Sequence, residues 1–236
     1  VTDDTVSIDA PGVMADNARD VLARGFQAVK MKVGTNHEDD LARVAAVRAA
    51  IGEETPLRID ANQGWDVATA VRLLNALTPY NVQYCEEPIA HWNLAGQRTV
   101  RQNSPIPIVA DESLFDHHDA YRLAAAGACD YFNIKLAKSG GIHTALKIDA
   151  VAEGAGIPCQ LGCMFETRLA SSAAAHFVCA RPNIQYLDLD SHTGHASDPV
   201  IGGIEYDTGG ITVPDEPGHG ADFAADFLAG LESVSI

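Results

Sequence analysis

Lysines and carboxylates gather at the ends of short apolar segments, where they could act together on a small molecule. Four of the five lysines fall in two short strings, Lys30-Met-Lys32 and Lys135-Leu-Ala-Lys138. Acidic side chains close three other apolar segments, in the strings RIDANQGW, YCEEPI and VADES. Lysines that served only solubility would be scattered along the surface, so this distribution indicates a polar site.

Three consecutive apolar segments end in polar or acidic side chains: Asp60 and Asn62, then Glu86 and Glu87, then Asp111 and Glu112. Neighbouring carboxylates that point into one opening repel one another and raise one another's pKa. A bound divalent cation removes that conflict. Ligands that are all oxygen favour Mg²⁺, with Mn²⁺ or Ca²⁺ as alternatives, and the lack of His and Cys argues against Zn²⁺. A single acidic residue here could equally be a helix N-cap, so the prediction depends on the three together.

The lysines are expected on two sides of this acidic centre. Lys32 closes the second apolar segment and Lys135 the sixth, which would lie across an eight-stranded barrel from each other. Strand alternation puts Lys30 on the same face as Lys32, where its charge would lower the pKa of Lys32 towards that of a useful base. This arrangement suits removal of a proton from a carbon next to a carboxylate, through an enediolate that a cation stabilises. A lysine on each face would invert that carbon.

Such a site needs a scaffold whose strands all end on one side. Apolar runs alternate with Ala-rich amphipathic stretches at the even spacing of strand–helix–strand units. We predict eight strands, at 6–9, 28–33, 57–62, 82–86, 108–112, 131–136, 158–163 and 184–190. We predict seven helices between them, at 13–24, 39–51, 67–77, 94–103, 118–126, 143–153 and 169–180. The even spacing favours an α/β fold of the TIM type, a (β/α)7β barrel, over an open sheet, and no glycine-rich phosphate-binding motif follows the first strand.

Composition limits the function classes. The formal net charge of −16 argues against nucleic acid and anionic membrane surfaces as partners. No apolar run approaches the roughly 18 residues of a membrane span. The five cysteines include no CxxC pair, which is typical of buried thiols in a reducing cytoplasm. We therefore expect a cytoplasmic protein with a small-molecule substrate, and the sequence leaves a homo-oligomer open.

The two ends of the sequence differ from the barrel pattern. Residues 1–190 are predicted to form the barrel, and the Gly- and Pro-rich residues 191–236 a tail that packs on the barrel or on a neighbouring domain, with a short helix at 222–228. The sequence begins without Met and without an apolar signal segment. We expect it to be a processed product or part of a longer protein.

The strings KMK, DANQGW, EEP, ADES and KLAKSGG, at barrel-strand spacing, resemble the muconate-lactonizing subgroup of the enolase superfamily. The resemblance implies a Mg²⁺-dependent enzyme with these residue roles: Asp60, Glu86 and Asp111 as metal ligands, Lys32 and Lys135 as acid/base groups, and Lys30 and Asn62 in support. It also implies an α+β capping domain before the first barrel strand. That domain is absent from this sequence, so we expect it in cis in a longer protein or as a separate chain.

Asp188 and Asp190 place two carboxylates on one face at the end of the eighth segment. Such a pair suits a cationic group, and a DxD at this point resembles the dipeptide epimerases, in which it binds the substrate's α-ammonium. We expect an isomerase, a dipeptide epimerase that inverts the α-carbon of the C-terminal residue. The alternatives are the same site in an N-acylamino acid racemase, an o-succinylbenzoate synthase or a cycloisomerase, or a non-catalytic barrel unit.

Overall fold

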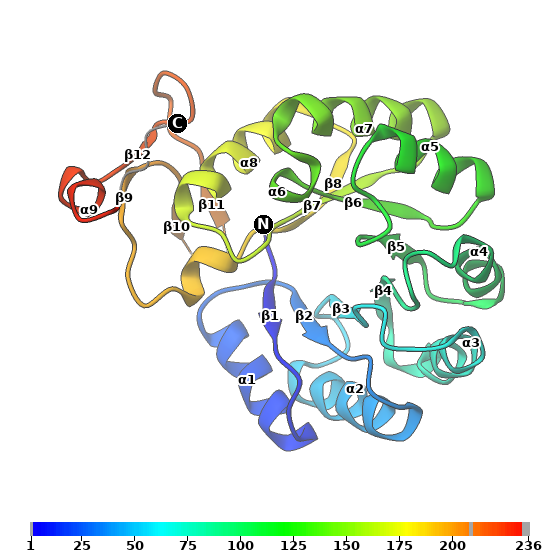
Figure 1. Ribbon diagram of the computed structural model, residues 1–236. Coiled ribbons are helices and arrows are strands. Elements are labelled where there is room, and N and C mark those ends of the chain that lie inside the picture. The colour runs from blue at the N-terminus through cyan, green and yellow to red at the C-terminus, as the bar shows by residue number, and fades with distance from the viewer. Residues whose placement is uncertain (1, 208–209, 233–236) are drawn as a thin grey trace.

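Eight parallel strands form a barrel at the centre of the computed structural model, which describes residues 2–207 and 210–232 (Figure 1). They follow chain order around the barrel: β1 (Asp4–Val6), β2 (Val29–Lys32), β3 (Leu57–Asp60), β4 (Val82–Glu86), β5 (Ile108–Ala110), β6 (Tyr131–Lys135), β7 (Cys159–Gly162) and β8 (Ile184–Asp188). Hydrogen bonds from Leu189 N to Thr2 Oγ1 and from Thr5 N to Asp190 Oδ2 connect the residues just after β8 to β1 and to the residue Thr2 before it. The predicted TIM-type barrel is confirmed.

Helices follow the first seven strands and cover the outside of the barrel (Figure 1). They are α1 (Pro11–Ala23), α2 (His37–Ile51), α3 (Val67–Ala76), α4 (Leu94–Asn103), α5 (His117–Ala126), α7 (Ile142–Ala155) and α8 (Arg168–Ala180). Four of them begin where a side chain accepts a hydrogen bond from the first turn: Asn36, Asp66, Asn93 and Asp116. The 3₁₀ turn η1 (Thr78–Tyr80) and the short α6 (Leu136–Ser139) were not predicted. After β8 comes the 3₁₀ turn η2 (Ser191–Gly194), so the pattern is (β/α)7β.

Alternation along the strands separates the polar interior from the apolar outer layer. In β2, Val29 and Met31 are fully buried and alternate with Lys30, which is also buried. The apolar pair faces the helices, because Lys30 meets carboxylates from β4 and β8 inside the barrel. The interior at the carboxyl ends of the strands is therefore a layer of paired charges.

Of the eight barrel strands, only β4 has the predicted bounds. β2, β6 and β7 differ by one residue at one or both ends, and β1, β3, β5 and β8 differ by two or more. β5 and β8 end early where a side chain accepts a hydrogen bond from the next backbone N–H. β5 ends before Asp111, whose N–H donates to Glu87 Oε2 at 2.7 Å. β8 ends before Leu189, whose N–H donates to Thr2 Oγ1 at 2.9 Å. β1 lies earlier than the predicted 6–9, where its backbone pairs with β2.

The part of the tail that the structure describes adds two small antiparallel pairs and one short helix. They are β9 (Val200–Gly202) with β12 (Ala221–Phe223), β10 (Glu205–Asp207) with β11 (Gly210–Thr212), and α9 (Ala225–Ala229). The predicted helix at 222–228 is wrong at its start, because 221–223 pair with β9. Ile204 N donates to Ser172 Oγ at 3.0 Å, so this segment packs on α8. The domain boundary after residue 190 stays a prediction. No helix within the described ranges is long and apolar enough to cross a membrane.

A buried ion pair lies inside the barrel below the charged layer. Arg58 Nη1 donates to Asp3 Oδ2 at 2.7 Å, and the side chains are 8% and 0% exposed. The guanidinium also lies over two rings, with its carbon 5.5 Å from the Tyr84 centroid and 4.9 Å from the Tyr186 centroid. Arg58 therefore neutralises a carboxylate that has no access to water.

Removing this arginine should be costly for stability. Arg58→Ala leaves the Asp3 carboxylate buried without its cation, so the free energy of unfolding should fall by about 3–5 kcal/mol in chemical denaturation. The control is Arg19→Ala, which removes a pair with Asp16 whose side chains are 57% and 76% exposed. That change should cost less than about 1 kcal/mol. Equal costs in the two variants would contradict the assignment of a buried pair.

Candidate active site at the carboxyl ends of the strands

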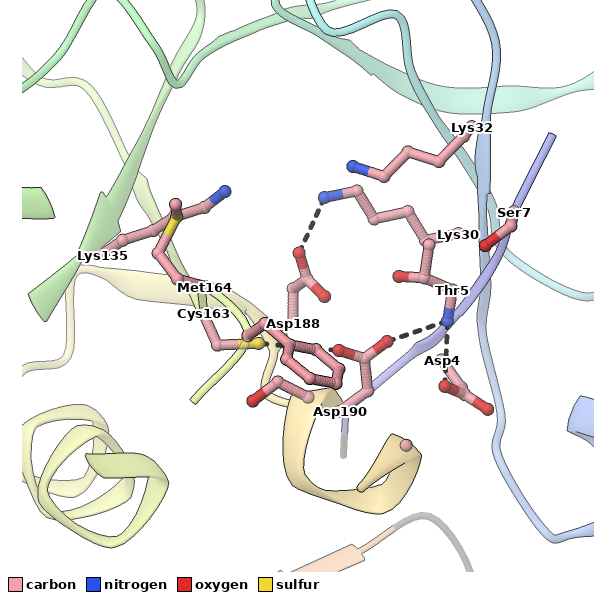
Figure 2. A pocket seen from close by; sticks show the side chains of 13 residues that line it. Asp4, Thr5, Ser7, Lys30, Lys32, Lys135, Cys163, Met164, Asp188 and Asp190 are labelled. Carbon is pink, nitrogen blue, oxygen red and sulfur yellow. Dashed lines mark hydrogen bonds and ion pairs between the residues drawn. The ribbon is translucent and has the colours of Figure 1, made fainter. Parts of the chain in front are cut away.

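A pocket of about 350 Å³ opens at the carboxyl ends of the barrel strands. Lys30 and Lys32 line it from β2, Lys135 from β6, and Asp188 from β8. Figure 2 shows Lys135 reaching towards the centre from one side and Lys30 and Lys32 from the other. Three strands separate β2 from β6 in either direction around the barrel, so these lysines face each other across its mouth.

Lys32 is paired with the carboxylate at the end of the neighbouring strand. Its Nζ lies 2.6 Å from Asp60 Oδ2, and its side chain is 31% exposed, whereas that of Asp60 is fully buried. Burial and the nearby Glu86 raise the pKa of Asp60 to about 6, against the opposing effect of Lys30 and Lys32. Lys32 is thus the amine at this end of β2 that both faces solvent and lines the pocket.

Lys30 connects three strands through its ammonium group. Its Nζ lies 2.7 Å from Asp188 Oδ2, 2.8 Å from Glu86 Oε2 and 3.4 Å from Asp60 Oδ2. Burial alone would lower the pKa of Lys30, but these carboxylates hold the pKa well above its usual value. Lys30 is therefore a permanent cation that fixes the acidic side chains, a role beyond the predicted influence on Lys32.

Lys135 and Lys138 both bind Asp111. Lys135 Nζ lies 2.7 Å from Asp111 Oδ2, while Lys138 Nζ contacts Asp111 Oδ1 and the carbonyl oxygens of Asp111 and Asn133. Burial acts to lower the pKa of Lys135, but Glu86 and Asp111 outweigh it and raise that pKa. We assigned no role to Lys138 from the sequence. The turn α6 folds the string KLAK back on β6, and lysines three residues apart on a helical turn share a face.

The two acidic residues at the end of β4, Glu86 and Glu87, lie in different environments. Glu86 points inwards, where it accepts hydrogen bonds from Asn133 Nδ2 at 2.9 Å and Gln160 Nε2 at 3.2 Å. Burial alone would raise the pKa of Glu86, but Lys30, Lys135 and Lys32 hold it well below its usual range.

Glu87 turns away from the pocket and organises the loop after β5. Its carboxylate accepts hydrogen bonds from Asp111 N at 2.7 Å, Gln97 Nε2 at 2.7 Å and Ser113 Oγ at 2.8 Å. Burial raises the pKa of Glu87 to about 8. Glu112 does not line this pocket either, and its Oε1 accepts a hydrogen bond from Asn62 Nδ2 at 3.0 Å. Glu86 and Asp111 are thus the members of their acidic pairs that contact the pocket lysines. These are the two that the family resemblance implies as metal ligands.

The donor set formed by Asp60, Glu86 and Asp111 fits a hard divalent cation. All three offer only carboxylate oxygens, and each is neutralised by at least one lysine ammonium, so this layer is built to hold positive charge. Their ligand atoms do not all lie within 4.8 Å of one another in the described structure, and each carboxylate contacts one or two lysines. Mg²⁺ binding would therefore exchange these lysine–carboxylate pairs for carboxylate–metal contacts.

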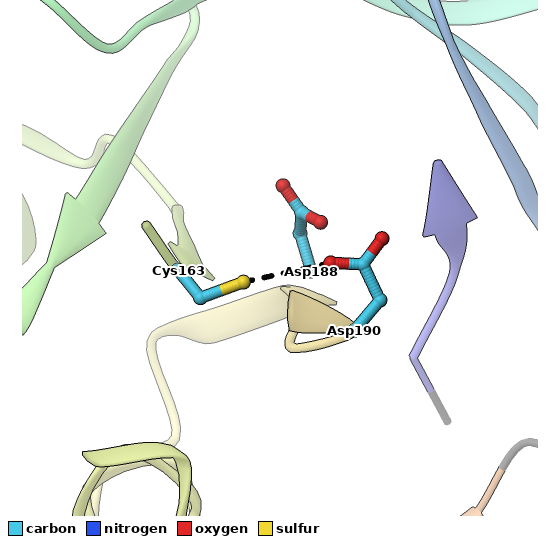
Figure 3. A group of neighbouring side chains, drawn as sticks. All are labelled: Cys163, Asp188 and Asp190. Atoms are coloured by element: carbon cyan, nitrogen blue, oxygen red, sulfur yellow. Dashed lines mark hydrogen bonds between the residues drawn. The ribbon is translucent and has the colours of Figure 1, made fainter. Parts of the chain in front are cut away.

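A second acidic cluster lies on the β8 side of the pocket. Within the described residues, only Cys163, Asp188 and Asp190 form a trio of Asp, Glu, His or Cys side chains whose ligand atoms all lie within 4.8 Å of one another (Figure 3). Burial raises the pKa of the Cys163 thiol, and its Sγ lies 3.5 Å from Asp190 Oδ1. The thiol is therefore a hydrogen-bond donor here rather than a thiolate ligand.

Asp188 and Asp190 do not occupy equivalent positions, contrary to the prediction that both end the strand. Asp188 is the last residue of β8, and Asp190 lies in the following loop, where its Oδ2 accepts the N–H of Thr5 at 2.9 Å. Burial and the charge of Asp188 raise the pKa of Asp190 to about 7. Both carboxylates line the pocket together with Cys163, which the sequence interpretation did not include.

Comparison with known proteins gives one consistent result. The chain matches the family model described as "Enolase C-terminal domain-like" over residues 13–227. It is 46% identical to the D-Ala-D/L-Ala epimerase of Cytophaga hutchinsonii over 236 residues, which are 100% of this chain and 64% of that protein. It is 35% identical to the N-succinyl-L-Arg/Lys racemase of Bacillus cereus over 227 residues, 96% of this chain and 61% of that protein. The chain thus spans less than two thirds of the length of these curated relatives.

A solved structure of similar sequence shares the fold in detail. It is the crystal structure of the dipeptide epimerase from Cytophaga hutchinsonii complexed with Mg and the dipeptide D-Ala-L-Val. The TM-score is 0.96 at 46% sequence identity, and the match covers 98% of this chain and 63% of that chain.

Proposed function

The chain belongs to the enolase C-terminal domain-like family, and from that premise we propose that it is the barrel of a Mg²⁺-dependent dipeptide epimerase. The reaction is a 1,1-proton transfer at the α-carbon of the dipeptide's C-terminal residue. The observation that carries the proposal is the entry of Lys32 and Lys135 into one pocket from opposite sides. That arrangement supports proton removal on one face of a carbon and proton return on the other.

The two lysines divide the proton transfer between them. One neutral amine removes the α-proton, and the electron pair of the broken C–H bond spreads onto the adjacent carboxylate as an enediolate. The ammonium of the opposite lysine then gives its proton to the other face of the carbon. The opposite stereoisomer uses the same two groups in reversed roles.

Mg²⁺, or Mn²⁺ in its place, would be held by Asp60, Glu86 and Asp111. When bound, the ion supplies positive charge for the substrate carboxylate on which negative charge develops. Lys30 supports this set by fixing Glu86 and Asp60 from inside the barrel. Asn62 supports it through its backbone N–H, which donates to Asp60 Oδ1 at 2.9 Å.

The substrate's α-ammonium is assigned to Asp188 and Asp190. Asp190→Asn removes the negative charge that Asp190 carries above its pKa of about 7, and it leaves the Lys30–Asp188 pair intact. We expect kcat/KM for dipeptides to fall at least on the order of 30-fold, because a buried charge pair is lost. This corresponds to a loss of about 2 kcal/mol in transition-state stabilisation. Steady-state rates with a dipeptide and with its N-acylated analogue give the comparison, and the analogue should be affected little.

A second candidate uses the same site on N-acylated amino acids. In the structure both carboxylates have partners, Lys30 for Asp188 and the Thr5 N–H for Asp190, which favours a substrate without an ammonium group. Full activity of Asp190→Asn would support this racemase function, or one of the other subgroup reactions, over dipeptide epimerisation.

A capping domain, in cis or as a separate chain, is proposed to complete the pocket. Met164 and Phe165 line the pocket and are 51% and 76% exposed, so its apolar rim is open to solvent. Closure by a further domain would exclude water from the proton transfer.

The direct test is isotope exchange. The full-length protein as made in its source organism, incubated in D₂O with Mg²⁺ and a panel of dipeptides, should place deuterium at the α-carbon of the C-terminal residue. EDTA should abolish the exchange. Exchange confined to N-acylamino acids would select the second candidate, and no exchange with any substrate would reject both.

A further inference from the structure

Asp40, in the first turn of α2, is fully buried and lies outside the pocket. Its Oδ2 accepts hydrogen bonds from Gly34 N at 3.0 Å, Thr35 N at 2.8 Å and Trp65 Nε1 at 2.9 Å. Its Oδ1 accepts hydrogen bonds from Thr35 Oγ1 at 3.0 Å and Arg43 Nη1 at 2.9 Å. One side chain therefore satisfies five donors, far more than an N-terminal helix residue needs.

Four of these five donors belong to two different loops of the site, and the fifth, Arg43, lies on α2 itself. Gly34 and Thr35 lie in the loop after β2, which ends at Lys32. Trp65 lies in the loop after β3, which ends at Asp60. Asp40 thus joins the segments that carry the two partners of the 2.6 Å pair between the Lys32 ammonium and the Asp60 carboxylate.

Backbone contacts leave these two loops little freedom to slide. Gly34 has φ +104°, and a Cβ there would lie 2.2 Å from Ala61 O. A Cβ on Gly64 would lie 2.1 Å from Gly34 O. Val33 N also donates to Asp60 O at 2.8 Å. The side-chain hydrogen bonds of Asp40 therefore act on two loops that are already in backbone contact.

We propose that Asp40 is a positioning residue that fixes the Lys32 amine, and hence the face from which Lys32 approaches the substrate carbon. The inference rests on the proposed function. Lys135 is held by Asp111 on the far side of the barrel, so Asp40 serves one of the two proton-transfer groups and not the other. A purely structural role would slow both half-reactions alike, which separates the two explanations.

The experiment compares both stereoisomers of one dipeptide by their rates of α-deuterium exchange, in the full-length protein with Mg²⁺. Lys32→Ala identifies the isomer that depends on Lys32. Asp40→Asn keeps the shape of the side chain but leaves one acceptor oxygen for the five donors. Trp65→Phe is the milder variant, because it removes only one of these donors. The matched control is Asp149→Asn, a fully buried aspartate of α7 that is paired with Arg181.

Asp40→Asn should slow exchange of the Lys32-dependent isomer by about 10- to 100-fold more than that of the other isomer, as expected for an ångström-scale misplacement. Trp65→Phe should also slow the Lys32-dependent isomer more than the other, by a smaller factor. If Asp40→Asn does not fold, Trp65→Phe provides the test. Asp149→Asn should affect both isomers equally. Equal losses for both isomers in the Asp40 and Trp65 variants, with Lys32→Ala still selective, would overturn this inference alone. A wild-type protein that exchanges neither isomer would overturn the proposed function and this inference with it.

Discussion

Replacing Lys32 or Lys135 by alanine should stop proton exchange selectively, each variant losing exchange from a different stereoisomer. A positioned general base contributes about 10²- to 10⁴-fold, so we expect a loss of that size for one isomer and a smaller one for the other. The reason is geometric, because each amine reaches the pocket from its own side of the barrel. The measurement is α-deuterium exchange of each isomer followed by NMR.

The control for these variants is the one lysine that lies outside the two strings at 30–32 and 135–138. Lys147 is exposed on α7 and does not line the pocket, so Lys147→Ala should leave both exchange rates unchanged. Small and equal losses in the Lys32 and Lys135 variants would show that the two amines do not act as opposed acid and base.

Asp111→Asn should weaken Mg²⁺ binding strongly. Even the loss of a group that only supports a metal ligand costs about 10- to 100-fold in affinity, and the loss of a charged ligand should cost at least as much. Isothermal titration with Mg²⁺ measures this without any substrate, and proton exchange should fall in parallel. Because Lys135 and Lys138 also bind this carboxylate, thermal unfolding of the variant must accompany the titration.

The matched control is Asp16→Asn, which removes an exposed carboxylate of α1. It should leave Mg²⁺ affinity unchanged. Unchanged affinity in Asp111→Asn would contradict the ligand assignment. Lost affinity in a protein whose wild-type form turns over no substrate would instead favour a non-catalytic barrel unit.

The architecture could be predicted from the sequence because the pattern is repeated and local. Each strand is a short apolar run, and several helices begin at an Asn or Asp that caps the first turn. Strand ends were less predictable, because β5 and β8 stop where the side chains of Glu87 and Thr2 bind the next backbone N–H. Those contacts join positions distant in sequence, so no local pattern reveals them. The resemblance to the enolase superfamily is confirmed by the family match over residues 13–227.

The candidate site was predictable in its members but not in its pairings. The residues alone could not decide between Glu86 and Glu87, since that choice depends on which side chain turns inwards after β4. From the sequence, Lys30 was predicted only to influence its neighbour Lys32. Its contact with Asp188 could not be predicted, because the two residues are 158 positions apart in the sequence.

A crystal structure with Mg²⁺ and a bound dipeptide would show directly whether two lysines flank the reacting carbon. We predict one ion on the carboxylates of Asp60, Glu86 and Asp111, with the Nζ atoms of Lys32 and Lys135 on opposite faces of the α-carbon of the C-terminal residue. Two amines on the same face of that carbon, or turned away from it into solvent, would contradict the account.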